Sequence, residues 1–159
     1  MDYSKTQPTL YKGKLFSSML KARWAVFFDN LPIEWIYKPN GKFPDFWLPQ
    51  VHMWAEVRPI DLTSYDYEQA FNLVTETKYA LLMLIGNKPK YRPYYALEYH
   101  TNGAVHRCIS PYALSNYGNY PEEEHRFYFC CGDNLNDEGV EFSDTIDAIY
   151  ASRRIDFTP

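Results

Sequence analysis

The chain has 159 residues, of which 46% are hydrophobic and 18% aromatic, and a formal net charge of −4. This length favours one domain with a core of its own. No apolar run approaches the length of a membrane span, and the first residues lack the apolar stretch of a signal peptide. Three cysteines without a Cys-x-x-Cys pair argue against a disulfide framework. We therefore expect a single cytoplasmic domain with no membrane partner.

Charge is distributed unevenly along the chain. Residues 1–42 carry seven basic and three acidic side chains, a net charge of +4, whereas residues 117–150 carry nine acidic and one basic, a net charge of −8. The basic segment could contact phosphate groups. The acidic segment is either a solvated surface or a binding site for a basic partner.

The first regular element is predicted to be a helix over residues 15–31, after a loose arm over residues 1–10. Its apolar side chains recur with helical spacing and form one stripe: Phe16, Leu20, Trp24, Phe27 and Leu31. Arg23 falls inside this stripe, and a buried arginine needs a partner. It could hold the helix to the sheet through an ion pair with Asp45 or Glu56, or it could contact phosphate.

Three short strands are predicted next. The first, over residues 33–39, ends at the turn signal Asn40-Gly41. The other two fold back on each other around a four-residue loop over residues 49–52. Pairing that is symmetric about this loop joins residues whose numbers sum to 101, so it sets Asp45 directly opposite Glu56. Arg58 follows two residues later on the same face.

Asp45 and Glu56 form a candidate metal site on the sheet face near the first helix. Directly opposed side chains have Cβ atoms about 4.5–5.5 Å apart, and two carboxylates at that separation repel unless a proton or cation lies between them. Hard oxygen ligands suit Mg²⁺ or Mn²⁺. The alternative is an ordinary Pro-Asp turn beside a solvated Glu-x-Arg face, and a register slip of one residue would separate the acids.

A second helix is predicted to begin at Thr63 or Ser64. Its apolar stripe is Tyr67, Ala70, Phe71 and Val74. The continuous apolar run over residues 80–85 is typical of a strand that is covered on both faces. A strand, helix and strand in this order make a right-handed crossover, which places residues 80–85 parallel to residues 54–58.

The rest of the chain is predicted to form a β-rich extension, residues 87–142, and a closing helix, residues 143–157. The extension contains a hairpin and a further strand: residues 94–100 with 104–109, and residues 125–131. Ser143 or Asp144 would cap the closing helix.

Residues 87–95 interleave three basic side chains with three tyrosines. Such a strip can follow a phosphate backbone while its aromatic rings stack on bases. An ordinary proline-rich surface loop is an equally good interpretation.

The hairpin contains Pro44-Asp45, a spacer and Glu56-x-Arg58, and this order resembles the core motif of the PD-(D/E)xK nuclease superfamily. Further strings resemble small, often phage-encoded members: Tyr11-x-Gly13-x-x-Phe16, residues 22–29, 33–39 and 44–49, and, more weakly, residues 148–157. The resemblance implies an α/β fold with a restriction-endonuclease-like αβββαβ core, over residues 11–86, around a mixed central sheet.

The resemblance also implies site roles. Asp45 and Glu56 would hold Mg²⁺ or Mn²⁺, which polarises the scissile phosphate and acidifies a water. Arg58 stands where the motif has lysine; it could stabilise charge on the phosphate but cannot act as a base. Lys21 stands where these proteins carry a glutamate on the first helix, so it either weakens metal binding or replaces the missing lysine.

Gln69, with Glu68 and Lys78, could complete the site from the second helix. DNA would be bound by basic and aromatic side chains outside the acid pair: Arg23, Lys88, Lys90, Tyr91 and Arg92.

Three functions fit these features. The favoured one is a nuclease-like DNA-processing protein, a Mg²⁺-dependent endodeoxyribonuclease with a weakened site. The second is a catalytically inactive nuclease-fold protein that binds DNA. The third is a phage-type anti-defence protein whose acidic region, residues 122–147, binds a host protein by imitating the charge of DNA. The two retained acids favour the first function, and the two altered positions favour the others.

Overall fold

The fold is known from a computed structural model, which describes residues 7–31, 34–38, 43–49, 52–60, 62–89, 94–99, 103, 105–110, 115–116, 127–128 and 142–157. The elements follow in chain order: β1 (Thr9–Tyr11), β2 (Lys14–Phe16), α1 (Met19–Asn30), β3 (Ile36–Tyr37), β4 (Phe46–Leu48), β5 (Met53–Arg58), α2 (Ser64–Thr77), β6 (Ala80–Ile85), β7 (Tyr94–Tyr99), β8 (Val105–Ser110), β9 (Ser115–Asn116), β10 (Phe127–Tyr128) and α3 (Phe142–Arg154).

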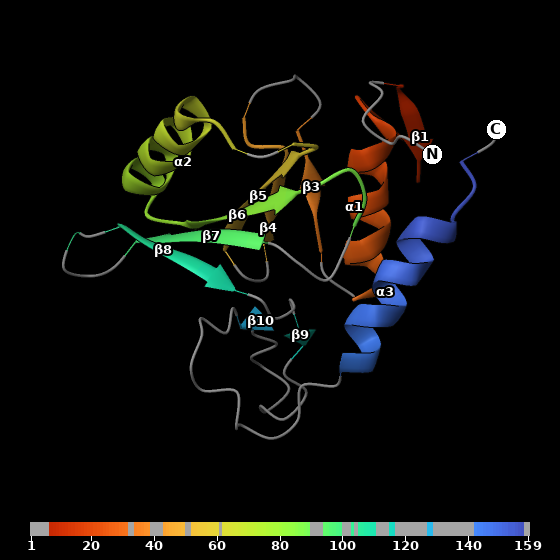
Figure 1. Ribbon diagram of the computed structural model, residues 1–159. Coiled ribbons are helices and arrows are strands. Elements are labelled where there is room, and N and C mark those ends of the chain that lie inside the picture. The colour runs from red at the N-terminus through yellow and green to blue at the C-terminus, as the bar shows by residue number, and fades with distance from the viewer. Residues whose placement is uncertain are drawn as a thin grey trace.

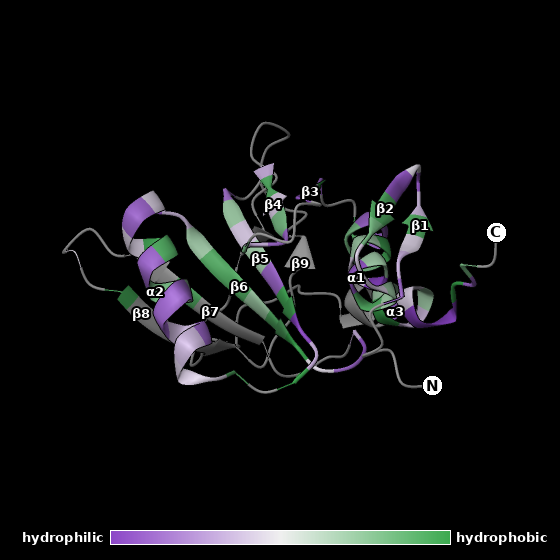
Figure 2. Cartoon of the chain, turned by 90° about the horizontal axis from the view of Figure 1, so that it is seen from above, coloured by the Kyte–Doolittle hydropathy of each residue, from purple (hydrophilic) through white to green (hydrophobic). Residues whose placement is uncertain are grey.

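The described elements form a mixed α/β structure in three layers. A six-stranded sheet with the order β3-β4-β5-β6-β7-β8 lies between α2 on one face and α1 with α3 on the other (Figures 1 and 2). Strands β5 and β6 are parallel, and the other neighbours are antiparallel. The mixed α/β class and the parallel pair joined by α2 are therefore as predicted.

Strand β6 is apolar throughout because both of its faces are covered. Leu82 and Leu84 belong to the hydrophobic cluster that includes α1, whereas Leu81, Met83 and Ile85 belong to the cluster that includes α2. Since successive side chains of a strand point to opposite faces, this run places one apolar set against each helical layer.

The first helix is shorter than predicted. It begins at Met19, where the Ser18 hydroxyl accepts a hydrogen bond from the Lys21 backbone N–H at 3.3 Å, as serine commonly does at a helix N-cap. Phe16 instead ends β2, although it is fully buried in the α1 cluster. The predicted arm is also partly wrong, because Thr9 pairs with Phe16 in the β1–β2 hairpin; residues 1–6 lie outside the described part.

The second helix has the predicted cap. The Thr63 side chain accepts a hydrogen bond from the Asp66 backbone N–H, and the Asp66 carboxylate accepts one from the Thr63 backbone N–H, which together make a capping box. Ala70 and Val74, four residues apart, face the sheet. Phe71 is 49% exposed, so its place in the predicted stripe was wrong: it lies one residue beyond the buried row.

The β7–β8 hairpin confirms the predicted pairing around Gly103. Strand β10 covers only two residues of the predicted strand over residues 125–131, and the others lie outside the described part. The final helix begins at Phe142. Ser143 and Asp144 therefore lie inside the helix, and the prediction that either one caps it was wrong. No helix among the described residues combines the length and apolar character that crossing a membrane requires.

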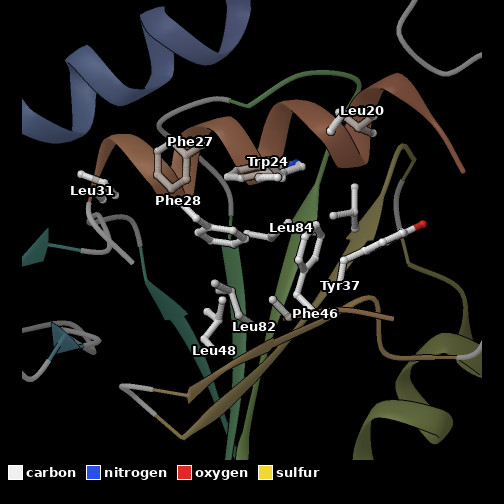
Figure 3. Packing of buried hydrophobic residues seen from close by; sticks show 14 of the residues in the cluster. Leu20, Trp24, Phe27, Phe28, Leu31, Tyr37, Phe46, Leu48, Leu82 and Leu84 are labelled. Atoms are coloured by element: carbon white, nitrogen blue, oxygen red, sulfur yellow. The ribbon is translucent and has the colours of Figure 1, made fainter. Parts of the chain in front are cut away.

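The main core lies between α1 and the sheet, and it is rich in aromatic rings (Figure 3). Phe28 on α1 packs edge to face with Phe46 on β4, at a centroid distance of 5.5 Å. Trp24 and Phe27 form a second such contact at 5.0 Å. The contact between Phe28 and Phe46 holds α1 against β4, the strand that follows Asp45.

We expect Leu82→Ala, in the centre of β6, to lower the free energy of unfolding by about 2–5 kcal/mol, because it leaves a cavity at a fully buried position. Urea denaturation measures this change. Leu15→Ala, at a leucine that is 61% exposed, is the matched control and should change stability by less than about 0.5 kcal/mol. Equal losses would contradict the placement of β6 in the core.

Candidate functional site

Asp45 and Glu56 are cross-strand neighbours, as predicted. Strands β4 and β5 pair Phe46 with Ala55 and Trp47 with Trp54, so residue numbers sum to 101 and the next pair outward is Asp45 with Glu56. The Asp45 backbone N–H donates to Glu56 Oε2 at 2.9 Å. Each acid is thus fixed by the opposite strand.

Both carboxyl groups are buried: Asp45 is 3% exposed and Glu56 4%. The Val57 backbone N–H donates to Asp45 Oδ2 at 3.0 Å. This bond from β5 to Asp45 complements the bond that Glu56 on β5 accepts from the Asp45 backbone. These reciprocal bonds satisfy one oxygen of each carboxyl group. They also explain why two acids can lie this close inside the protein.

A cation lies against the other oxygen of each acid. Lys21 Nζ of α1 is 2.5 Å from Asp45 Oδ1, and Arg58 Nη2 is 3.4 Å from Glu56 Oε1. Both cations remain partly open to solvent, with side chains 20% and 30% exposed. All four carboxyl oxygens therefore have a partner within the protein.

The expectation that the pair lies on the sheet face near α1 was only half right. Lys21 reaches Asp45 from α1. Glu56, however, alternates along β5 with Ala55 and Val57, which belong to the α1 cluster. Because neighbouring side chains of a strand point to opposite faces, Glu56 and Arg58 project to the α2 side.

Asp66, in the first turn of α2, is a third acid of the site, which the sequence alone does not connect with the acid pair. Its Oδ1 lies 3.1 Å from Arg58 Nη2. Hydrogen bonds from the Thr63 side chain and backbone, and then the charge of Arg58, hold the pKa of Asp66 below its usual value. The Thr63-x-x-Asp66 capping signal fixes this carboxylate at the start of α2, close to the end of β5. We call Lys21, Asp45, Glu56, Arg58 and Asp66 the acid–cation cluster.

Burial raises the pKa of Glu56 from 4.5 to about 8, and the neighbouring charge of Asp45 adds to the shift. Arg58, Lys21 and the hydrogen bond from the Asp45 backbone act in the opposite direction. The loss of hydration dominates because the group is almost completely removed from water. Burial therefore favours the protonated form of Glu56.

The arrangement does not fit the Mg²⁺ or Mn²⁺ that the resemblance implies. A divalent cation needs free carboxylate oxygens, and here the oxygens face two backbone N–H groups, an ammonium group and a guanidinium group. Among the described residues, no three or more His, Cys, Asp or Glu side chains are grouped so that they could hold a metal ion.

The contacts seen for the other predicted catalytic residues lie within α2. Gln69 donates to the hydroxyl of Tyr65, at 2.6 Å, on α2, and Glu68 is exposed. Lys78 caps the C-terminal end of α2 and donates to the carbonyl of Thr75. That end of α2 adjoins Trp54, because Trp54 Nε1 donates to Thr77 Oγ1 at 3.3 Å, whereas Asp66 lies at the other end of the helix.

Of the predicted DNA contacts, Arg23 is 5% exposed. It donates to the carbonyl of Ser152 at 2.6 Å and lies over the ring of Phe157, at 5.4 Å. These contacts join α1 to the C-terminal part of the chain. Lys88 is exposed after β6. Lys90, Tyr91 and Arg92 lie outside the described residues, as does most of the acidic region 122–147.

The fold and the cluster define a three-layer mixed α/β protein in which a buried acid pair is closed by two cations. Comparison with protein-family models, with curated proteins and with solved structures finds no match.

The pKa of Glu56 predicts a pH dependence of stability. Between pH 4.5 and about 8 the folded protein keeps a proton that the unfolded chain loses, so the free energy of unfolding should fall as pH rises through this range, by at most about 1.4 kcal/mol per pH unit. Glu56→Gln removes this proton equilibrium but keeps an acceptor for the Asp45 N–H, so its stability should fall less steeply.

Urea denaturation at a series of pH values measures the two slopes. Glu68→Gln, at an exposed glutamate of α2, is the control and should behave like the unsubstituted protein. Identical pH slopes for the Glu56→Gln variant and the unsubstituted protein would show that Glu56 ionises normally.

Proposed function

We propose that this protein is nuclease-like and binds DNA. Because cations contact both members of its acid pair, the unsubstituted protein binds DNA without cutting it. The supporting observation is that Lys21 and Arg58 contact the two carboxyl groups that a nuclease of this type would use for metal. The α-β-β-β-α-β order from α1 to β6 supports a restriction-endonuclease-like arrangement.

The charge of the cluster supports binding without catalysis. With every group ionised, three acids and two cations leave one negative charge. With Glu56 protonated, which its raised pKa favours at neutral pH, the cluster is neutral. Divalent cations depend on a surplus of carboxylate charge, whereas a DNA phosphate is attracted by partly exposed lysine and arginine side chains.

A weakened endonuclease is the second candidate. The observation in its favour is that Asp45 and Glu56 retain the opposed positions that the motif requires. The host-protein function depends on the acidic region 122–147, most of which lies outside the described residues, and it stays a prediction.

We expect salt-sensitive binding of duplex DNA through the strip that begins at the exposed Lys88. Replacing Lys88, Lys90 and Arg92 together with glutamine should weaken binding and reduce the slope of log K against log salt by about 0.9 for each phosphate group that the variant no longer neutralises. Fluorescence anisotropy at several salt concentrations measures both effects. Arg154→Gln, at an exposed cation of α3, is the control. No binding at low salt would refute the proposed function.

The double substitution Lys21→Glu with Arg58→Lys should convert the cluster into a metal site, because it replaces the cation beside Asp45 with a carboxylate. We expect Mn²⁺ affinity to rise in isothermal titration and Mg²⁺-dependent nicking of supercoiled plasmid to appear. Adding Asp45→Ala should abolish both. Strong cleavage by the unsubstituted protein that requires Asp45 would instead support the weakened-endonuclease candidate.

A further inference from the structure

Four aromatic side chains gather beside the acid–cation cluster, and we call them the aromatic platform: Trp47, His52, Trp54 and Tyr79. The Trp47 ring is the centre of the group, with centroid distances of 4.4 Å to Trp54, 5.0 Å to Tyr79 and 6.3 Å to His52. The rings of His52 and Tyr79 are nearly parallel, with an interplanar angle of 19°. Side chains from two strands, a loop and a helix–strand connection thus meet at one place.

Local structure holds these rings in position. Trp47 and Trp54 are a cross-strand pair of β4 and β5. The α2 helix ends at Lys78 in the left-handed conformation, with φ of 62°, which turns the chain into β6 and leaves Tyr79 at the corner. Thr77 Oγ1 accepts hydrogen bonds from Trp54 Nε1 and from the Tyr79 backbone N–H, both at 3.3 Å.

The platform is not simply an extension of the core. Trp47 and Tyr79 belong to neither hydrophobic cluster of the described residues. Tyr79 is 42% exposed, His52 is exposed, and Trp47 is partly exposed. The helix α2 packs mainly on β6, β7 and β8, and Figure 2 shows it over that part of the sheet. Grouped aromatic rings that remain open to water are typical of a binding surface.

Cations border the platform. Lys38 Nζ lies 4.3 Å from the centre of the Trp54 ring. Glu56 and Arg58 follow Trp54 on the same face of β5, at a spacing of about 7 Å for every two residues. Lys38 is the neighbour of Asp45 on the adjacent strand, since its backbone N–H donates to the Asp45 carbonyl at 2.9 Å. Lys38 and the cations of the acid–cation cluster therefore lie along the same side of the rings. Aromatic faces flanked by positive charge are the features that bind an unpaired nucleic-acid strand, because bases stack on the rings while phosphates meet the cations.

We propose that the aromatic platform binds the bases of single-stranded DNA, with Lys38 and Arg58 facing its phosphates. This inference rests on the proposed function and deepens it by naming the form of DNA. In a duplex, each base face is already covered by its neighbours, whereas an unpaired strand can offer its base faces to Trp47 and Tyr79. The platform should therefore favour single strands, in addition to the sequence-independent attraction of phosphate.

The test compares a fluorescein-labelled oligo-deoxythymidine with a duplex of the same length, by anisotropy at low salt. Tyr79→Ala should weaken binding of the single strand by roughly five-fold or more and leave duplex binding nearly unchanged. Tyr79→Phe should preserve binding, because it keeps the ring. Tyr150→Ala, at a tyrosine of α3 that is 49% exposed, is the matched control and should have no effect. His52→Ala provides a second variant in case Tyr79→Ala alters folding, which urea denaturation detects.

Single-strand affinity that survives both Tyr79→Ala and His52→Ala, with duplex binding intact, would overturn the platform and leave the proposed function standing. Equal losses for single strand and duplex would also overturn it, because they indicate a general effect. Tighter binding of oligo-uridine than of oligo-deoxythymidine would refute DNA as the occupant. Absence of binding to either form of DNA would refute both this inference and the proposed function.

Discussion

The reciprocal bonding of Asp45 and Glu56 is the constraint on which the rest of the site depends. Each carboxyl group accepts from a backbone N–H of the opposite strand, so the β4–β5 register and the positions of the two acids cannot change independently. Buried carboxyl groups without partners are costly. Lys21 and Arg58 complete this pairing, because they contact the remaining oxygens from α1 and from the end of β5.

The cluster also ties the layers of the fold together. Lys21 connects the first helix to the sheet through Asp45, and Arg58 connects β5 to the start of α2 through Asp66. Buried ion pairs are weak evidence of net stability, since desolvation offsets their attraction. Their effect here is on position. Because an unpaired buried charge would be destabilising, the starts of α1 and α2 are held in one arrangement relative to the β4–β5 hairpin.

Local and periodic features could be predicted from the sequence. The symmetric loop gave the pairing of Asp45 with Glu56, and the apolar run gave β6, because both depend on spacing along the chain. The start of α1 was predicted too early in the chain. Phe16 lies in a strand, but it is buried and its position also fits the helical stripe. The contacts of Lys21 and Asp66 with their partners could not be predicted, since they depend on how helices dock onto the sheet.

The register of the β4–β5 hairpin positions both the aromatic platform and the acid–cation cluster. In the observed pairing, Trp54, Glu56 and Arg58 share one face of β5, while Ala55 and Val57 enter the core. A slip of one residue would exchange these faces, and it would turn Glu56 and Arg58 toward the core while it exposed Ala55 and Val57. The core therefore selects the register, and the register places the aromatic rings beside the cations. Changes at Lys21 and at Tyr79 should then test the proposed metal site and the proposed DNA binding separately, because neither residue belongs to the two strands that fix this register.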